Sequence, residues 1–226
     1  MTQHKMNNQK TFIFDLDGVI VDTAKFHFLA WRKLANDLGF DFTEEQNEQL
    51  KGVSRVESLK KILKWGNMEL SEEDFNKQMA LKNKNYLSYV DKMDRAEILP
   101  GVEKVLDYLI EHNIPFALGS ASKNARTILK KIDQYDKFDA IVDGTDVSKA
   151  KPDPEVFLIA AEKLNAEPHN CVVFEDSVAG VQAANIGEMI SIGIGDEKVL
   201  SEADYIFADF TEIEIKFIEK LLRNEK

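Results

Sequence analysis

Two carboxylates separated by a single residue follow the first apolar run of the chain. Asp15 and Asp17 come directly after Phe12–Phe14 in the segment TFIFDLDGVIVDT. Such a run is typical of a buried strand, and carboxylates at its end need a compensating positive charge. A compensated carboxylate can attack phosphorus and become an acyl phosphate, while its neighbour transfers protons to and from the reacting oxygens. The pair therefore predicts phosphoryl transfer, with Asp15 as nucleophile and Asp17 as acid and base.

Polar residues also follow the later apolar runs of the chain. They are Ser120, Ser122, Lys123, Lys151, Glu175 and Asp176. Ligands of a parallel sheet lie beyond the carboxyl ends of its strands, so we expect these side chains to meet in one crevice. Clustered carboxylates repel one another unless a divalent cation is present, and oxygen ligands beside a phosphate favour Mg²⁺. We expect Lys151 and Ser120 to hold the phosphoryl oxygens, and the free N–H groups of a helix that opens at 122–124 to favour a phosphate.

The segments that position these residues alternate between short apolar runs and amphipathic helices. Strands are predicted at 12–14, 115–120, 138–143, 171–176, 189–194 and 204–208. Helices are predicted near 102–112, 123–132, 154–164 and 177–186, with Asp153 and Pro154 at the start of the third. This alternation indicates a parallel sheet that is covered on both faces.

The region between the first strand and the rest has a purely helical pattern. Apolar residues recur every four positions from Phe26 to Leu38, and Gly39 ends this helix. Ser54 and Ser71 are capping residues that open two further helices. We therefore expect a Rossmannoid α/β catalytic core of residues 11–22 and 95–226, an inserted helical cap domain of residues 23–94, and a disordered leader of residues 1–10.

Composition limits the partners of the protein. The 226 residues carry a net charge of −11, which disfavours nucleic acid and anionic membranes because their phosphates repel an acidic surface. The single cysteine, Cys171, suits a reducing compartment, and no apolar run has the length of a signal peptide core or a membrane span. We expect a cytoplasmic monomer that binds a small molecule, and neither nucleic acid nor membrane.

Four motifs in a fixed order resemble those of the haloacid dehalogenase superfamily of phosphotransferases. They are DLDGVIVDT, the serine before a helix, Lys151-Pro152 and Glu175-Asp176, and they extend from about Phe12 to beyond Ile194. His27, the segment LKGVSR at 50–55, Lys82 and the segment GSASKN at 119–124 resemble the β-phosphoglucomutase family within it. That resemblance implies interconversion of β-glucose 1-phosphate and glucose 6-phosphate through β-glucose 1,6-bisphosphate.

The resemblance also implies a role for each matching residue. Metal would be held by Asp15, Asp17 through its backbone carbonyl, Glu175 and Asp176. The reacting phosphate would lie by Asp15, Ser120 and Lys151, and the non-reacting one by Arg55, Ser122, Lys123 and Asn124. The other residues expected to contact the sugar phosphate are His27, Lys51, Gly52, Lys82 and Ala121.

Two alternative functions remain open at this level. A Mg²⁺-dependent sugar-phosphate phosphatase would use the same fold and the same core motifs. A non-catalytic sugar-phosphate sensor would not need an acid and base, so the presence of both Asp15 and Asp17 argues against it. Taken singly, Asp176 also fits a helix cap, Lys151 a solvated loop residue, and His27 a packed helical residue.

Overall fold

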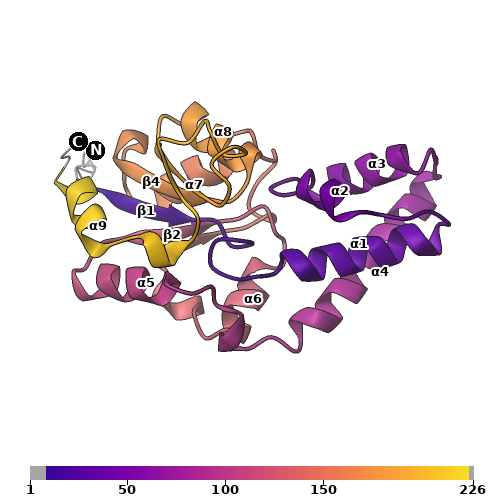
Figure 1. The fold of residues 1–226 in the computed structure, drawn as a ribbon, viewed down its shortest axis with the longest axis horizontal. Coiled ribbons are helices and arrows are strands. Elements are labelled where there is room, and N and C mark those ends of the chain that lie inside the picture. Colours follow the sequence, from indigo (N-terminus) through magenta and orange to yellow (C-terminus); the bar gives the residue numbers. More distant parts are fainter. Residues whose placement is uncertain (1–8, 224–226) are drawn as a thin grey trace, which may run out of the picture.

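A parallel sheet forms the centre of the larger part of the molecule (Figure 1). The computed structural model describes residues 9–223. Within them the sheet has six strands in the spatial order β3 (Ala140–Val142), β2 (Phe116–Gly119), β1 (Thr11–Phe14), β4 (Cys171–Glu175), β5 (Ile190–Ile194) and β6 (Tyr205–Phe207). Every pairing is parallel, so the carboxyl ends of β2, β1 and β4 lie side by side. The predicted fold class is confirmed.

Helices cover both faces of this sheet, as the alternating pattern predicts. One face carries α5 (Val102–Glu111), α6 (Ala125–Lys131) and α9 (Ile215–Leu222), and the other carries α7 (Glu155–Lys163) and α8 (Val178–Ile186). Short 3₁₀ turns lie at Arg95–Glu97, Tyr135–Lys137, Pro168–Asn170 and Phe210–Glu212. The rings of Phe14 and Phe174 stack with centroids 4.8 Å apart on the first face, which fixes β1 against β4 next to the predicted site.

Some element boundaries differ from those predicted. Helix α6 begins at Ala125, not at residue 123, because a turn at 122–124 precedes it. Helix α7 begins at Glu155 with Pro154 as its cap residue, while Asp153 Oδ1 accepts a hydrogen bond from the Glu155 N–H. Helix α9 was not predicted, although its apolar residues recur with helical spacing.

The predicted disordered leader lies largely outside the described residues, which begin at residue 9. Its last residue does not fit that prediction. Lys10 is buried and donates a hydrogen bond from Nζ to the backbone carbonyl of His169, 3.0 Å away. The ordered core therefore begins before Thr11, because the aliphatic part of Lys10 packs against it while its ammonium group finds a carbonyl partner.

Helices α1 to α4 lie apart from the sheet, beyond its carboxyl edge (Figure 1). They are α1 (Ala24–Asp37), α2 (Glu44–Glu48), α3 (Arg55–Trp65) and α4 (Glu72–Val90). They have an apolar cluster of their own, which includes Trp31, Leu34, Leu59 and Ile62. Ser54 caps α3 as predicted, accepting a hydrogen bond from the Glu57 N–H. The short α2 was not predicted, although Thr43 and Gln46 form its capping box.

The chain enters and leaves this helical part through two adjacent segments. The Asp22 N–H donates to the Glu97 carbonyl, 3.1 Å away, and the Leu99 N–H donates to the Ile20 carbonyl, 3.0 Å away. We propose that these paired segments divide a core from a cap at the boundaries that the sequence indicates. No helix within residues 9–223 is both long enough and apolar enough to cross a bilayer.

Candidate active site

A cleft of about 390 Å³ lies between the carboxyl edge of the sheet and the cap helices. The predicted site residues that line it are Asp15, Asp17, His27, Lys51, Gly52, Arg55, Lys82, Ser120, Ala121, Ser122, Lys123, Lys151 and Asp176. Two predicted residues are not in its lining. Glu175 is buried beside Lys151, and Asn124 donates a hydrogen bond from its side chain to Asn83 Oδ1 on α4, 3.0 Å away. The volume suits a small-molecule ligand.

A buried lysine joins the carboxylates at the ends of β1 and β4. Lys151 Nζ lies 2.6 Å from Asp15 Oδ1, and it also donates to Glu175 Oε1 and to the Gly119 carbonyl. Burial lowers the pKa of Lys151, but the charges of Asp15 and Glu175 outweigh burial and raise it above its usual value. Lys151 is therefore a fixed cation beside Asp15, and its reading as a solvated loop lysine is wrong.

The carboxylates of the site have too little positive charge around them. Burial raises the pKa of Asp15 to about 7, and repulsion from Glu175 and Asp17 adds to this effect, although Lys151 opposes it. Burial and the charge of Glu175 also raise the pKa of Asp176 well above its usual value. Because Lys151 is shared between Asp15 and Glu175, and Lys51, 3.5 Å from Asp176 Oδ2, is partly exposed, these two lysines do not compensate the cluster. A further cation is needed to keep Asp15 and Asp176 ionised.

The donor set fits Mg²⁺, with one difference from the predicted ligands. Asp15 and Asp176 offer carboxylate oxygens, and Mg²⁺ requires only one or two of these when waters and a phosphate complete its shell. Glu175 differs, because Oε1 accepts from Lys151 while Oε2 accepts from the N–H and Oγ of Ser177. Within residues 9–223 no three Asp, Glu, His or Cys side chains converge as a ready metal site. In this structure Glu175 thus holds Lys151 in place, and Asp15 and Asp176 are the carboxylates that line the cleft, while the role of Glu175 as a metal ligand stays a prediction.

Asp17 is oriented by residues from the start of the cap. Thr23 Oγ1 donates a hydrogen bond to Asp17 Oδ1, and His27 Nε2 lies 3.7 Å from the same oxygen. Burial alone would raise the pKa of Asp17, but hydrogen bonding and charge from His27, with the Thr23 hydroxyl, outweigh it and lower the pKa. Asp17 is therefore ionised and suited to accept a proton. Thr23 was not predicted as a site residue, although it belongs to the same DLDGVIVDT motif.

The cap contributes a buried lysine above Asp17. Lys82 Nζ lies 3.1 Å from His27 Nδ1 and 4.4 Å from the ring centroid of Trp31. Burial lowers the pKa of Lys82 to about 7, and the charge of Arg55 lowers it further than the charge of Asp17 raises it. An anion in the cleft would reverse this shift, so Lys82 is placed to gain a proton when a phosphate binds.

Lys82→Met should remove a pH dependence of stability. The unfolded chain keeps the ordinary lysine pKa of 10.5, whereas the folded value is about 7. Between these values the unfolded state binds a proton that the folded state does not, so wild-type stability should rise with pH across this window. The variant should lack this rise and be more stable at pH 7, by on the order of a few kcal/mol. Urea unfolding at a series of pH values measures both.

Lys84→Met is the matched control for this experiment, because Lys84 lies on the same helix with its side chain exposed. It should keep the wild-type dependence of unfolding free energy on pH. Parallel pH profiles for wild type and Lys82→Met would contradict the assigned pKa.

Two basic side chains, one from the cap helices and one from the core, line the cleft and have no ion-pair partner among residues 9–223. Neither Arg55 on α3 nor Lys123 before α6 forms an ion pair with any carboxylate among residues 9–223. Both line the same cleft as Asp15. Unpaired cations that line a cleft indicate that the cleft binds an anion.

The loop beside Lys123 differs in one respect from the prediction. The Ser122 N–H donates to Ser120 Oγ, 3.1 Å away, and the Asn124 N–H donates to Ser122 Oγ, 3.2 Å away. These two N–H groups are therefore not free helix donors, because short serine side chains satisfy them locally. An anion at this loop would be held by the side chains of Ser122 and Lys123.

Cap and core touch across the cleft in this structure. Lys51 Nζ lies 3.5 Å from Asp176 Oδ2, and Gly52 packs so closely on Ser177 that a Cβ at this position would overlap its hydroxyl. The Asn83–Asn124 hydrogen bond makes a second bridge. Asn83 was not predicted, since its partner is 41 residues away and no local pattern links the two.

The sheet order, the paired aspartates after β1 and the buried lysine define a class of protein. Residues 9–186 match the model of the haloacid dehalogenase-like hydrolases, and the chain belongs to this family of enzymes. It is 39% identical to the β-phosphoglucomutase of Bacillus subtilis (strain 168) over 213 residues, 93% of this chain and 94% of that protein. A solved structure of β-phosphoglucomutase from Clostridium difficile superposes with a TM-score of 0.91 at 41% identity, covering 96% of this chain and 98% of the other.

Phosphatases are also similar to this chain. A phosphorylated carbohydrates phosphatase of Thermotoga maritima is 33% identical over 198 residues, 84% of this chain and 89% of that protein. Fold and core motifs therefore do not separate isomerase from hydrolase.

Proposed function

We propose that this protein is a Mg²⁺-dependent β-phosphoglucomutase that interconverts β-glucose 1-phosphate and glucose 6-phosphate. The observation that carries the proposal is the pair of unpartnered cations, Arg55 from the cap and Lys123 from the core, in the cleft that contains Asp15. A substrate with two phosphates needs a second anion site facing the nucleophile, which a simple phosphatase does not need. The similarity to two β-phosphoglucomutases over more than nine-tenths of the chain supports the same reading.

Asp15 is the proposed nucleophile. One of its carboxylate oxygens forms a bond to the phosphorus of β-glucose 1,6-bisphosphate, and the bond from that phosphorus to the sugar oxygen breaks. Lys151, 2.6 Å from Asp15 Oδ1, is placed to contact the phosphoryl oxygens during this transfer, together with the Ser120 hydroxyl. Their positive charge and hydrogen-bond donation offset the repulsion between two anions. The product is an aspartyl-phosphate and a sugar monophosphate.

Asp17 is the proposed acid and base. In the protonated form it gives its proton to the sugar oxygen that leaves phosphorus, and in the ionised form it accepts the proton of the sugar hydroxyl that attacks the aspartyl-phosphate. Its lowered pKa suits the second of these steps. His27 and Thr23 hold the carboxylate in position for both.

The metal would be held by Asp15, Asp176 and the backbone carbonyl of Asp17, with Glu175 acting through Lys151. When bound, Mg²⁺ supplies the positive charge that keeps the carboxylates ionised and screens them from the phosphate. Arg55, Ser122, Lys123 and Asn124 would hold the phosphate that does not react. Closing the cap over that phosphate excludes water from the aspartyl-phosphate.

A sugar-phosphate phosphatase is the alternative that a specific finding favours, namely the 33% identity to a phosphorylated carbohydrates phosphatase. In a phosphatase, Asp17 would activate water rather than a sugar hydroxyl. The two proposals share every core residue and differ in what attacks the aspartyl-phosphate.

The product formed from β-glucose 1-phosphate should decide between them. With Mg²⁺ and a catalytic amount of β-glucose 1,6-bisphosphate, we expect glucose 6-phosphate as the main product, without the lag that we expect when no phosphoryl donor is added. Excess EDTA should abolish the reaction and Mg²⁺ should restore it. Release of mainly inorganic phosphate and glucose would replace the mutase by the phosphatase.

A further inference from the structure

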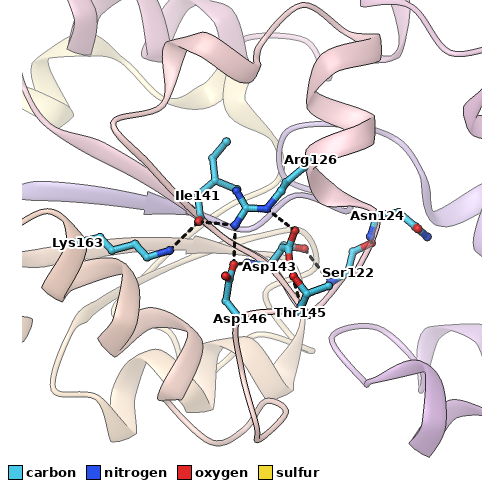
Figure 2. Close-up of polar contacts among 9 residues, drawn as sticks. Ser122, Asn124, Arg126, Ile141, Asp143, Thr145, Asp146 and Lys163 are labelled. Carbon is cyan, nitrogen blue, oxygen red and sulfur yellow. Dashed lines mark hydrogen bonds and ion pairs between the residues drawn. The ribbon is translucent and has the colours of Figure 1, made fainter.

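Arg126 lies just behind the loop that carries the proposed second phosphate site. It is the second residue of α6, directly after Ser122, Lys123 and Asn124, and it does not line the cleft. Figure 2 shows its side chain pointing toward Asp143 and Asp146, on the loop that follows β3. Its charge is therefore not available to a ligand in the cleft, and its role depends on the residues that its guanidinium contacts.

The guanidinium of Arg126 joins two carboxylates on that loop and one backbone carbonyl of β3. Nε lies 2.9 Å from Asp143 Oδ2, while Nη2 donates to Asp146 Oδ2 at 2.7 Å and to the Ile141 carbonyl at 3.1 Å (Figure 2). The fork of an arginine can satisfy several acceptors in one fixed geometry, which a lysine cannot do. Arg126 thereby fixes the start of α6 to the end of β3.

The carboxylates on the other side of this contact are themselves rigidly placed. Asp143 is 1% exposed, and its Oδ1 accepts from the N–H and the hydroxyl of Thr145. Asp146 Oδ2 also accepts from the Asp143 N–H, 2.9 Å away. The loop is therefore held by its own hydrogen bonds and offers Arg126 a preformed anchor.

This anchored loop contacts the proposed phosphate site directly. The Gly144 N–H donates to the Ser122 carbonyl, 3.3 Å away. A Cβ at Gly144 would overlap the carbonyl oxygen of Ala121, so the two loops are in close contact. Residues 122–124 are thus restrained at Ser122 through Gly144 and, two residues after Asn124, through Arg126.

We propose that Arg126 is a positioning residue that, through Asp143 and Asp146, fixes the Ser122–Asn124 loop for the phosphate that does not react. This inference rests on the proposed role of that loop as the second phosphate site. The reacting phosphate should not depend on Arg126, because Lys151 is held independently by Asp15, Glu175 and the Gly119 carbonyl. Loss of Arg126 should therefore affect donors with two phosphates and spare donors with one.

The test compares phosphorylation of the enzyme by β-glucose 1,6-bisphosphate and by acetyl phosphate, which has one phosphate group. The rate of phosphoenzyme formation is followed by quenched-flow sampling and intact mass. Arg126→Met should lower kcat/KM for the bisphosphate by roughly 10- to 100-fold, mainly through KM, because a displaced loop misplaces its ligand. The acetyl phosphate value should change by less than about threefold on the same argument. Arg126→Lys, which can still reach one carboxylate, should fall between Arg126→Met and wild type.

Two further variants are controls for the buried charge of Asp143 and for the loss of an arginine in general. Arg126→Met leaves Asp143 buried without its cation, so Arg126→Met/Asp143→Asn removes that charge and should show the same selective loss. Arg223→Met, which removes an exposed i,i+4 ion pair with Glu219 on α9, should behave as wild type. Equal losses for both donors, unchanged bisphosphate kinetics, or recovery in the double variant would overturn the positioning role. Because phosphoenzyme formation precedes attack by sugar or water, the comparison stands even if the enzyme proves to be a phosphatase.

Discussion

Asp15→Asn is expected to abolish turnover, by at least ~10³-fold, because the amide has the shape of the carboxylate but cannot attack phosphorus. The fold should survive, since Lys151 keeps Glu175 as its ion-pair partner when Asp15 is neutral. Loss of the charge also relieves the repulsion that contributes to the raised pKa of Asp15. The measurements are steady-state turnover with saturating Mg²⁺ and the intact mass of the protein after exposure to acetyl phosphate. Wild type should gain one phosphoryl group, and the variant none.

Asp22→Asn is the matched control for this variant. Asp22 lies in the same motif but on the surface, where it pairs with Lys25. It should be phosphorylated at the wild-type rate. Near-normal turnover in folded, metal-replete Asp15→Asn, or a phosphoryl group on another residue, would rule out the aspartyl-phosphate mechanism.

The sheet was predictable because its strands are short apolar runs, and β1 to β4 have a polar residue at or directly after their carboxyl end. Buried parallel strands such as Cys171–Glu175 need no alternation, so continuous apolar character marks them. Helices α2 and α9 were missed for different reasons. The five residues of α2 are too few to show a period, and only its capping box marks it. The apolar period of α9 is present in the sequence and was overlooked at the chain end.

The residues of the cleft were predictable where a motif fixes them to the end of a strand. Asp15, Lys151 and Asp176 each follow a strand that meets the others at one edge. The way their charges pair was not predictable. Lys151 donates a hydrogen bond to one oxygen of Glu175, a pairing that the resemblance, which implies Glu175 as a direct metal ligand, did not indicate.

Contacts between distant segments were not visible in the sequence. Lys82 and His27 are 55 residues apart, and Asn83 and Asn124 are 41 apart, so no local spacing links them. They meet because helices α1 and α4 pack side by side and the cap then lies over the core. The prediction of free N–H groups at 122–124 was wrong for a local reason. The serine hydroxyls of this loop accept hydrogen bonds from two of these N–H groups.

Arg55→Ala should convert the protein from a mutase into a slow phosphatase. Arg55 lies on α3 of the cap, lines the cleft and has no ion-pair partner among residues 9–223. Under the proposed mechanism it binds the non-reacting phosphate only when the cap is closed, so its loss removes both affinity and the drive to close. Glucose 6-phosphate formation should fall by ~10²-fold or more, since substrate misplacement alone has costs of this size. The measurement is the ratio of glucose 6-phosphate to inorganic phosphate formed from β-glucose 1-phosphate.

Hydrolysis of the aspartyl-phosphate should not fall, because it takes place at Asp15 and Asp17 and does not need Arg55. With acetyl phosphate as donor, Arg55→Ala should still release inorganic phosphate at the wild-type rate or faster, because an open cap admits water. Arg32→Ala removes an exposed arginine of the same cap, paired with Asp41, and should leave the product ratio unchanged. An unchanged mutase rate in Arg55→Ala would show that the second phosphate is held elsewhere. An equal fall in glucose 6-phosphate formation and in aspartyl-phosphate hydrolysis would instead show that Arg55 stabilises the fold of the cap. Loss of a contact to the non-reacting phosphate should lower only transfer to the sugar, and not transfer to water.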